Sequence, residues 1–205
     1  MKTLFIESRL KNLKLILSKQ EIAKLPKNLI LCYTIQYKLI AESIKKQLES
    51  NKIKILYFKQ VLGCSKLNNK SDLPILLIGT GKFHAINLYL QASELYILDI
   101  ADNHISKVPV QDIEKIKAKK RASLLKFLNA EKIGILVSTK PGQENMKKAI
   151  ELKKKLKNKG KQVFVFVSNN IDTSQFENFN IDSWINTACP GLSNDNSNII
   201  NYSEI

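Results

Sequence analysis

Short apolar runs alternate with longer amphipathic stretches along the first half of the chain. The runs have the length of buried strands, whereas the stretches between them repeat apolar positions every three or four residues, as helices do. We expect strands at Thr3–Ile6, Leu29–Thr34, Ile53–Phe58, Pro74–Ile78 and Glu94–Leu98, and helices at Leu10–Leu25, Tyr37–Ser50 and Phe83–Gln91. Strands separated by such helices predict βαβ units and a parallel sheet.

The same pattern restarts after a long lysine-rich stretch, Asp112–Leu128, which predicts a connecting helix. The second half then predicts strands at Ile133–Ser138, Gln162–Val167 and Ser183–Asn186, a helix at Glu144–Asn158, and a loop with a helical turn at Asn169–Asn180. A repeat of this length favours duplicated α/β domains over a solenoid. We therefore predict an α/β fold of two related domains with parallel-rich sheets, at residues 1–112 and 130–205, joined by a helix at 113–129.

The composition of the chain indicates where in the cell the protein is expected. Hydrophobic residues make up 44% of the chain, which is enough for a substantial core, yet no apolar run approaches the roughly 18 residues that span a bilayer. The first residues, Met1–Arg9, become charged too early for a signal peptide. We expect a soluble, cytoplasmic protein without a membrane partner.

The net charge of +15 allows two interpretations. Only Arg9 and Arg121 among the 33 basic residues are arginines, and lysine together with many Ile and Asn residues is typical of an A+T-rich genome. The other interpretation is an acidic partner, such as an acidic protein, a tRNA or the ribosome. Nucleic acid is disfavoured, because arginine dominates base recognition and the aromatic residues are not clustered with the lysines.

Three cysteines are the candidate chemical groups: Cys32, Cys64 and Cys189. Cys32 lies inside a predicted strand and is expected to be a small buried apolar residue. Cys64 and Cys189 each follow a strand in a short loop, where a thiolate can act as a metal ligand or as a nucleophile. The chain has no Cys-x-x-Cys or His-Glu-x-x-His spacing, so no local zinc site is predicted.

Two strand-to-helix loops are further candidates. Gly79–His84 has two glycines that let backbone N–H groups approach a ligand at a helix N-terminus, and Ser138–Gln143 offers hydroxyls, a lysine and a glycine. Each loop equally fits an ordinary tight turn, and His84 alone is more often structural. Neither loop has the spacing of a dinucleotide fingerprint or of a P-loop.

Four segments together resemble one known family. Gln60–Cys64, Ile78–His84, Ser138–Gln143 and Asn186–Asp195 occur in the order found in diphthamide synthase, or 2-(3-amino-3-carboxypropyl)histidine synthase, of the archaeal type. The resemblance covers nearly the whole chain. It implies a protein of related α/β domains in which each of three domains contributes one cysteine to a four-iron, four-sulfur (4Fe-4S) cluster.

The resemblance also implies an activity. In this family the fourth iron of the cluster, which no cysteine binds, binds S-adenosylmethionine. Cleavage of S-adenosylmethionine gives a 3-amino-3-carboxypropyl radical, which attacks a histidine of translation elongation factor 2. Cys64 and Cys189 match the second and third cluster ligands, and they are expected to approach each other. Residues of the two glycine-containing loops are expected to border the S-adenosylmethionine pocket: Gly79, Gly81, His84, Ser138, Thr139, Lys140, Gly142 and Gln143. No residue is assigned a catalytic role.

The chain departs from the family pattern in two ways. It starts where the second domain of the family starts, so the first domain and its cysteine have no counterpart. Gly191 follows Pro190 where the family usually has arginine. Two hypotheses follow: either another chain supplies the missing domain and third cysteine, in a homo- or hetero-oligomer, or the protein is a noncatalytic accessory subunit of a diphthamide synthase complex.

Overall fold

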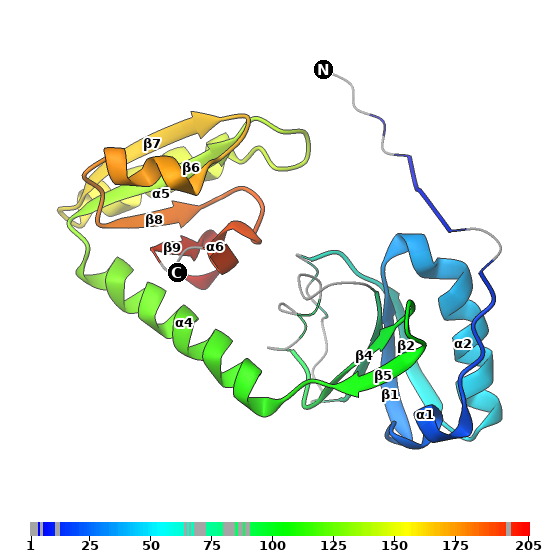
Figure 1. Ribbon diagram of the computed structural model, residues 1–205. Coiled ribbons are helices and arrows are strands. Elements are labelled where there is room, and N and C mark those ends of the chain that lie inside the picture. Colours follow the sequence, from blue (N-terminus) through cyan, green and yellow to red (C-terminus); the bar gives the residue numbers. More distant parts are fainter. Residues whose placement is uncertain are drawn as a thin grey trace. The chain divides into compact units, whose positions relative to one another are not determined.

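The computed structural model divides into two compact units, Met1–Glu114 and Lys115–Ile205 (Figure 1). The structure describes residues 4, 6–10, 13–63, 65, 67, 73–79, 85, 88, 91–195 and 198–205. The boundary between the units falls inside helix α4 (Val110–Asn129). Each unit has its own sheet and its own core, and is described separately below.

The first unit is built on a five-stranded sheet with the order β2-β1-β3-β4-β5. The first four strands of this order are parallel, and β5 pairs with β4 in the antiparallel direction. Its elements are α1 (Lys19–Ala23), β1 (Asn28–Tyr33), the 3₁₀ turn η1 (Ile35–Tyr37), α2 (Lys38–Ser50), β2 (Lys54–Gln60), β3 (Ile75–Ile78), β4 (Leu95–Asp99) and β5 (His104–Lys107). Strand β5 was not predicted. The helix expected at Phe83–Gln91 lies largely outside the described residues.

Helix α2 covers one face of this sheet because its apolar residues recur at helical spacing. Ile40, Ile44 and Leu48 are buried in one cluster with Leu29 and Leu31 of β1. Each such side chain contributes about 1.5–3 kcal/mol when it is fully removed from water. Burial of this face therefore holds α2 on the parallel strands.

The predicted helix at Leu10–Leu25 is wrong, since α1 is the only helix among its described residues and residues 13–18 are not helical. Ser18 begins α1, with its Oγ accepting from the Glu21 N–H at 3.2 Å. Before Ser18 the burial alternates: Leu15 and Leu17 are 8% and 5% exposed, whereas Ile16 is 78% exposed. Gln47 of α2 fixes this segment, because its Oε1 accepts from Leu17 N at 3.0 Å and its Nε2 donates to Leu15 O at 2.8 Å. Contacts with α2 thus replace helical hydrogen bonds here.

The strand predicted at Thr3–Ile6 does not form at its two described residues, Leu4 and Ile6. Thr3 and Phe5 lie outside the described residues. Leu4 and Ile6 are 83% and 85% exposed, so no packing surface favours an extended conformation there.

The outer edge of β5 is covered by two side chains from α1 and its C-terminal cap. The Glu21 carboxylate accepts from Ile105 N at 2.6 Å, and Lys24 Nζ donates to Ile105 O at 3.2 Å. Lys24 also donates to Glu21 Oε1 at 2.7 Å. The backbone hydrogen bond and the Lys24 contact lower the pKa of the Glu21 carboxyl, with the Lys24 side-chain hydrogen bond as the largest cause. The ion pair therefore attaches α1 to the sheet edge.

The second unit has a four-stranded, fully parallel sheet with the order β7-β6-β8-β9. After α4, its elements are β6 (Lys132–Ser138), α5 (Met146–Asn158), β7 (Gln162–Ser168), η2 (Thr173–Asn178), β8 (Ser183–Asn186), α6 (Leu192–Asp195), β9 (Ile199–Asn201) and η3 (Tyr202–Glu204). Strand β9 and helix α6 were not predicted. In both units the first strand lies between the second and the third, so the predicted class, two related α/β domains with parallel-rich sheets, is confirmed.

The two faces of the second sheet have different cores. Ile133 and Ile135 of β6 pack with the buried side of α5. On the opposite face Trp184 lies against Gly134 and stacks on Phe176 of η2, with ring centroids 4.1 Å apart. A Cβ at position 134 would lie 2.4 Å from Trp184 Cε3, so glycine is required there for close packing.

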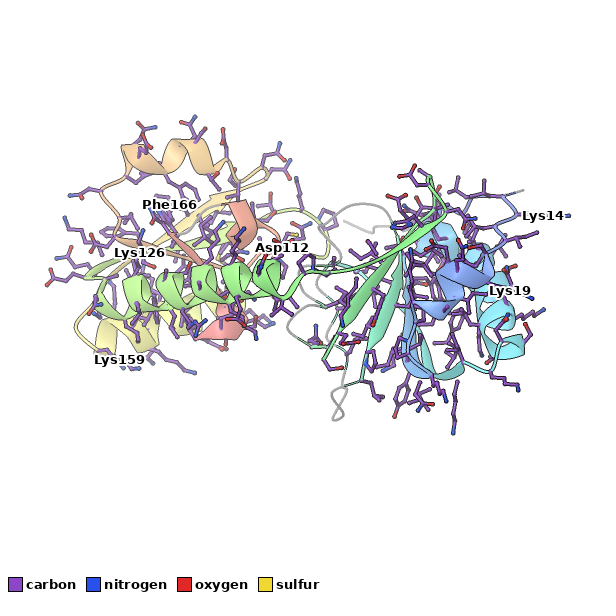
Figure 2. The ribbon with its side chains drawn as sticks, turned by 60° about the horizontal axis from the view of Figure 1, so that its bottom comes forward. Lys14, Lys19, Asp112, Lys126, Lys159 and Phe166 are labelled. Atoms are coloured by element: carbon purple, nitrogen blue, oxygen red, sulfur yellow. The ribbon has the colours of Figure 1, made fainter. Side chains whose placement is uncertain are left out.

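Lysine side chains are exposed on both units. Figure 2 labels Lys14 and Lys19 in the first unit and Lys126 and Lys159 in the second, all of them exposed. The charge of +15 is therefore shared between the two units. Within the part of the chain that the structure describes, no helix combines the length and the apolarity needed to cross a membrane.

Candidate functional site

The candidate loops of the second unit lie where the strand order changes direction. The chain runs from β6 to β7 on one side of β6 and later returns to β8 on the other side. Ser138 ends β6 and Asn186 ends β8, and these two strands are direct neighbours. Open α/β sheets bind ligands in the crevice at such a switch point, outside the carboxyl ends of the strands. The loops that carry Ser138–Gln143 and Cys189 both begin at the carboxyl ends of these two strands.

Cys189 is a free, half-buried cysteine three residues after the end of β8. The side chain of Asn186 holds its loop: Oδ1 accepts from Ala188 N at 2.9 Å, and Nδ2 donates to Cys189 O at 2.7 Å. Leu192 N also donates to Cys189 O, at 3.1 Å. The backbone on both sides of the thiol is therefore fixed by hydrogen bonds.

Asn145 links the Cys189 loop to the loop after β6. Its Nδ2 donates to Thr187 O at 2.7 Å and also bonds Gln143 O at 3.4 Å. Thr187 is anchored to β6, because its N and Oγ1 both donate to Leu136 O, at 3.1 and 2.7 Å. Two of the predicted site segments are thus joined in one hydrogen-bonded structure.

The loop Ser138–Gln143 is itself a hydrogen-bonded turn. Ser138 is buried, its Oγ donating to Asn169 O at 3.3 Å and accepting from Lys140 N at 3.1 Å. Gln143 N donates to Lys140 O at 3.0 Å, and Gly142 has a φ of 78°, which favours glycine. The Ser138 hydroxyl is thus used to shape the loop, whereas Thr139 is exposed and Lys140 partly exposed at its surface.

A small cavity of about 130 Å³ lies beside the Cys189 loop. It is bordered by Ala188 and Pro190, the two neighbours of Cys189 in the chain, and by Lys148 of α5. Its other lining residues are Asn145, Asn186, Thr187, Asn201, Tyr202 and Ser203. Lys148 supplies one cation, whereas the side chains of Asn145, Asn186, Thr187 and Asn201 are already engaged in hydrogen bonds.

The predicted residues of the first unit are only partly described. Gly79 follows β3, and a Cβ on it would lie 3.4 Å from Thr34 Cγ2, so the residue lies close to the end of β1. Cys64, Gly81 and His84 lie outside the described residues. On either side of Cys64, Leu62 N donates to Ser65 Oγ at 2.7 Å and Ser65 N donates to Leu62 O at 3.0 Å. The predicted approach of Cys64 to Cys189 stays a prediction.

Cys32 has the environment expected of a structural cysteine. Its side chain is 0% exposed within β1, and burial raises the pKa of its thiol to about 12, although nearby Lys59 opposes this shift. A thiol of this pKa does not ionise near neutral pH, and the thiolate is the form that binds metals. The prediction that Cys32 is a buried apolar residue is confirmed.

Cys189 is suited to be one ligand of an iron–sulfur cluster, but one cysteine cannot hold a cluster alone. Among the described residues, no group of three or more His, Cys, Asp or Glu side chains is placed to hold a metal ion. Cys189 nevertheless has what a cluster ligand needs: a free, partly exposed thiol on a loop held by amides at the edge of a sheet.

Sequence reasoning missed the contribution of the asparagines. Asn186 belongs to a segment quoted for the family resemblance, but no role was assigned to it, and Asn145 and Asn201 were not singled out. One signal was available: Trp184-Ile185-Asn186 and Ile199-Ile200-Asn201 end alike, and in the sheet they pair residue for residue. In this chain the shared ending marks two strands that lie side by side.

Comparison with known proteins gives a consistent family. Residues 1–203 match the family model for diphthamide synthesis proteins. The 2-(3-amino-3-carboxypropyl)histidine synthase of Pyrococcus horikoshii is 30% identical over 183 residues, which are 83% of this chain and 52% of that protein. Its counterpart in Methanocaldococcus jannaschii is 25% identical over 169 residues, 81% of this chain and 46% of that protein. Subunit 1 of the synthase of Debaryomyces hansenii is 30% identical over 177 residues, 79% of this chain and 42% of that protein.

A solved structure agrees with these sequences. The crystal structure of Dph2 from Pyrococcus horikoshii with a 4Fe-4S cluster has a TM-score of 0.76 and 26% identity to this chain. The similarity covers 90% of this chain and 58% of the Pyrococcus chain. The chain thus spans about half the length of the curated relatives that it matches. Its sequence, from one end to the other, and its paired α/β units confirm the resemblance, and the chain belongs to the diphthamide synthesis protein family.

Proposed function

We propose that this chain is part of a 2-(3-amino-3-carboxypropyl)histidine synthase that acts on a histidine of translation elongation factor 2, the first step of diphthamide biosynthesis. The observation that carries the proposal is the Cys189 loop, a free thiol held by amide hydrogen bonds at the carboxyl edge of a parallel sheet. The cluster named in the Pyrococcus structure and the synthase names of the relatives support it.

In this proposal Cys64 and Cys189 hold two corners of a 4Fe-4S cluster, and a third thiolate comes from another chain. When bound, the cluster supplies the electron that cleaves S-adenosylmethionine between its sulfur and the γ-carbon of the methionine part. The protein must hold the cofactor and orient the co-substrate so that the 3-amino-3-carboxypropyl group leaves toward the histidine.

The loops of the proposed pocket offer suitable groups for that orientation. Lys140 is partly exposed and cationic, and it can bind the carboxylate of S-adenosylmethionine. Ser138, Thr139, Gly142 and Gln143 shape or line the same loop, and Gly79, Gly81 and His84 belong to the segment that follows β3 of the first unit. Lys148, which lines the cavity beside the Cys189 loop, offers a second cation close to that loop.

A second candidate function is a noncatalytic accessory subunit of a diphthamide synthase complex. One feature favours it: Gly191 stands where the family usually has arginine, so a cation beside the Cys189 loop is missing. An accessory subunit would keep the fold and the loop without holding the cluster of the active chain.

Anaerobic co-expression with a chain that supplies the remaining family domain distinguishes the two functions. We expect the pair to bind iron and sulfide and to convert S-adenosylmethionine into an aminocarboxypropyl product. Cys64→Ala or Cys189→Ala should abolish both, because each change removes an iron ligand that water replaces poorly. Cys32→Ala is the matched control, and the pair carrying it should retain its iron. Normal turnover with both Cys64 and Cys189 replaced would establish the accessory function instead.

A further inference from the structure

Asn201 ends β9 and lies outside every segment that the family resemblance uses. Its side chain is buried, and it is the register partner of Asn186 across the β8–β9 pair. A buried amide is expensive unless its polar atoms find partners. The amide oxygen and the amide nitrogen of Asn201 form hydrogen bonds with different parts of the second unit.

The amide oxygen of Asn201 is bonded to the end of β8 and to η3. Asn201 Oδ1 accepts from Asn186 Nδ2 at 2.8 Å and from the backbone N–H of Glu204, as part of a capping box at η3. The Glu204 side chain completes the capping box, because its Oε2 accepts from Asn201 N at 3.2 Å. Lys120 of α4 donates to the other oxygen of Glu204 at 2.6 Å. The oxygen end of Asn201 is thus anchored within the second unit.

The nitrogen of the same amide faces the Cys189 loop. Asn201 Nδ2 donates to Ser193 Oγ at 2.7 Å and to Pro190 O at 3.3 Å, and Ser193 Oγ donates to Pro190 O at 3.0 Å. Asn186 holds the preceding carbonyl, that of Cys189. Two paired asparagines therefore fix two consecutive carbonyls, one at the thiol and one directly after it.

We propose that Asn201 is a positioning residue for Cys189. Its Nδ2 holds Pro190 and Ser193 so that the backbone of Cys189 presents the thiol in one orientation. A metal ligand works best when the groups around it fix its direction, because a loose ligand loses conformational entropy on binding. The inference rests on the proposed role of Cys189 as an iron ligand, and it assigns the orientation of that ligand to a residue outside the known motif.

Asn201→Asp separates the positioning role from a purely structural one. Aspartate keeps the oxygen that accepts from Asn186 and Glu204, but it has no N–H to donate to Pro190 and Ser193. Ser193→Ala removes the hydroxyl partner from a partly exposed site, and Ser193→Thr restores a hydroxyl. Asn178→Ala, at an exposed position of η2, is the matched control.

The readout is the alkylation rate of Cys189 in the full chain without iron, measured by peptide mass spectrometry under native conditions. We expect Asn201→Asp and Ser193→Ala to raise this rate at least about fivefold, the factor for the loss of one ordinary hydrogen bond. Ser193→Thr and Asn178→Ala should label at the wild-type rate, and circular dichroism should show that Asn201→Asp remains folded. A wild-type rate in both Asn201→Asp and Ser193→Ala would overturn the proposal.

The iron content of the co-expressed pair tests the proposed function separately. If Cys189→Ala leaves the iron content unchanged, Cys189 is not a ligand, whatever the alkylation rates show. If Cys189→Ala removes the iron and Asn201→Asp lowers it while Asn178→Ala does not, both the ligand and its positioning residue are supported.

Discussion

Asn186 and Asn201 are register partners at the carboxyl ends of β8 and β9, and the amide of Asn186 donates to that of Asn201 at 2.8 Å. Both side chains are buried, so breaking the pair would leave polar groups that water cannot reach. The last strand of the sheet and the Cys189 loop are therefore stabilised by the same two residues.

The three cysteines should react very differently with iodoacetamide in the native chain. Burial raises the pKa of Cys32 to about 12, three units above an ordinary thiol, so its thiolate population near pH 8 falls about a thousandfold. Cys189, and by expectation Cys64, should be modified first, and Cys32 only after unfolding. Peptide mapping over time measures this order. Modification of Cys32 at the rate of Cys189 would contradict the assignment.

Gly134→Ala should destabilise the second unit by about 1–3 kcal/mol, the usual cost of overpacking. The new Cβ would lie 2.4 Å from the ring of Trp184, which is also held by Phe176. Urea unfolding followed by circular dichroism measures the loss. Trp184→Phe in the same chain should recover part of the stability, and additive losses in the double variant would show that the ring is not the cause.

Asp182→Asn should reduce stability at neutral pH and have little effect in acid. Asp182 accepts from Lys132 N at 2.8 Å and from Glu131 N at 3.0 Å, and these backbone hydrogen bonds, Lys132 first, lower the pKa of its carboxyl. A lowered pKa contributes stability above the unfolded value of about 4, and this contribution is lost as the pH falls through the folded pKa.

The expected loss at pH 7 is at most about 1 kcal/mol, since water screens the exposed carboxylate. Thermal unfolding of wild type and variant between pH 3 and pH 7 measures it, with the exposed Glu177→Gln as control. A difference that grows toward pH 3 would have the wrong sign.

Gln47→Ala should release the segment before α1. Gln47 accepts from Leu17 N and donates to Leu15 O, and alanine can do neither. Hydrogen exchange of the Leu17 amide should accelerate, roughly 25-fold for the loss of two ordinary hydrogen bonds of about fivefold each. Lys46→Ala, at the exposed neighbouring position, should leave the exchange rate unchanged. Equal exchange in both variants would mean that burial of Leu15 and Leu17 alone holds the segment.

The sequence predicts elements with long, regular apolar patterns and misses those that depend on partners. Ser183–Asn186 was placed without error, and α2 and α5 were placed within two residues. The Leu10–Leu25 helix failed because its leucines fit a helix as well as an alternating segment, and distant partners such as Gln47 and Asn103 decide between them. Strand β5 has one apolar residue, Ile105, among its four, and β9 has three residues, so neither shows the apolar pattern of a strand.

The site shows the same division. Cys189, Ser138 and Lys140 are recognisable because they follow strong strands in polar loops, and the structure places their loops on neighbouring strands. The role of Asn201 depends on a contact between residues 190 and 201 that passes through an unpredicted helix and an unpredicted strand. No local pattern encodes such a contact.

The ion pair of Glu21 and Lys24 has a consequence for association between molecules. An edge strand with free backbone groups is a template on which a second chain can add a strand, and such pairing leads to aggregation. At Ile105 both the N–H and the carbonyl of β5 are already occupied by these two side chains. A second copy therefore finds no backbone partner at this residue, and the pair of charges blocks strand addition there as well as attaching α1 to the sheet.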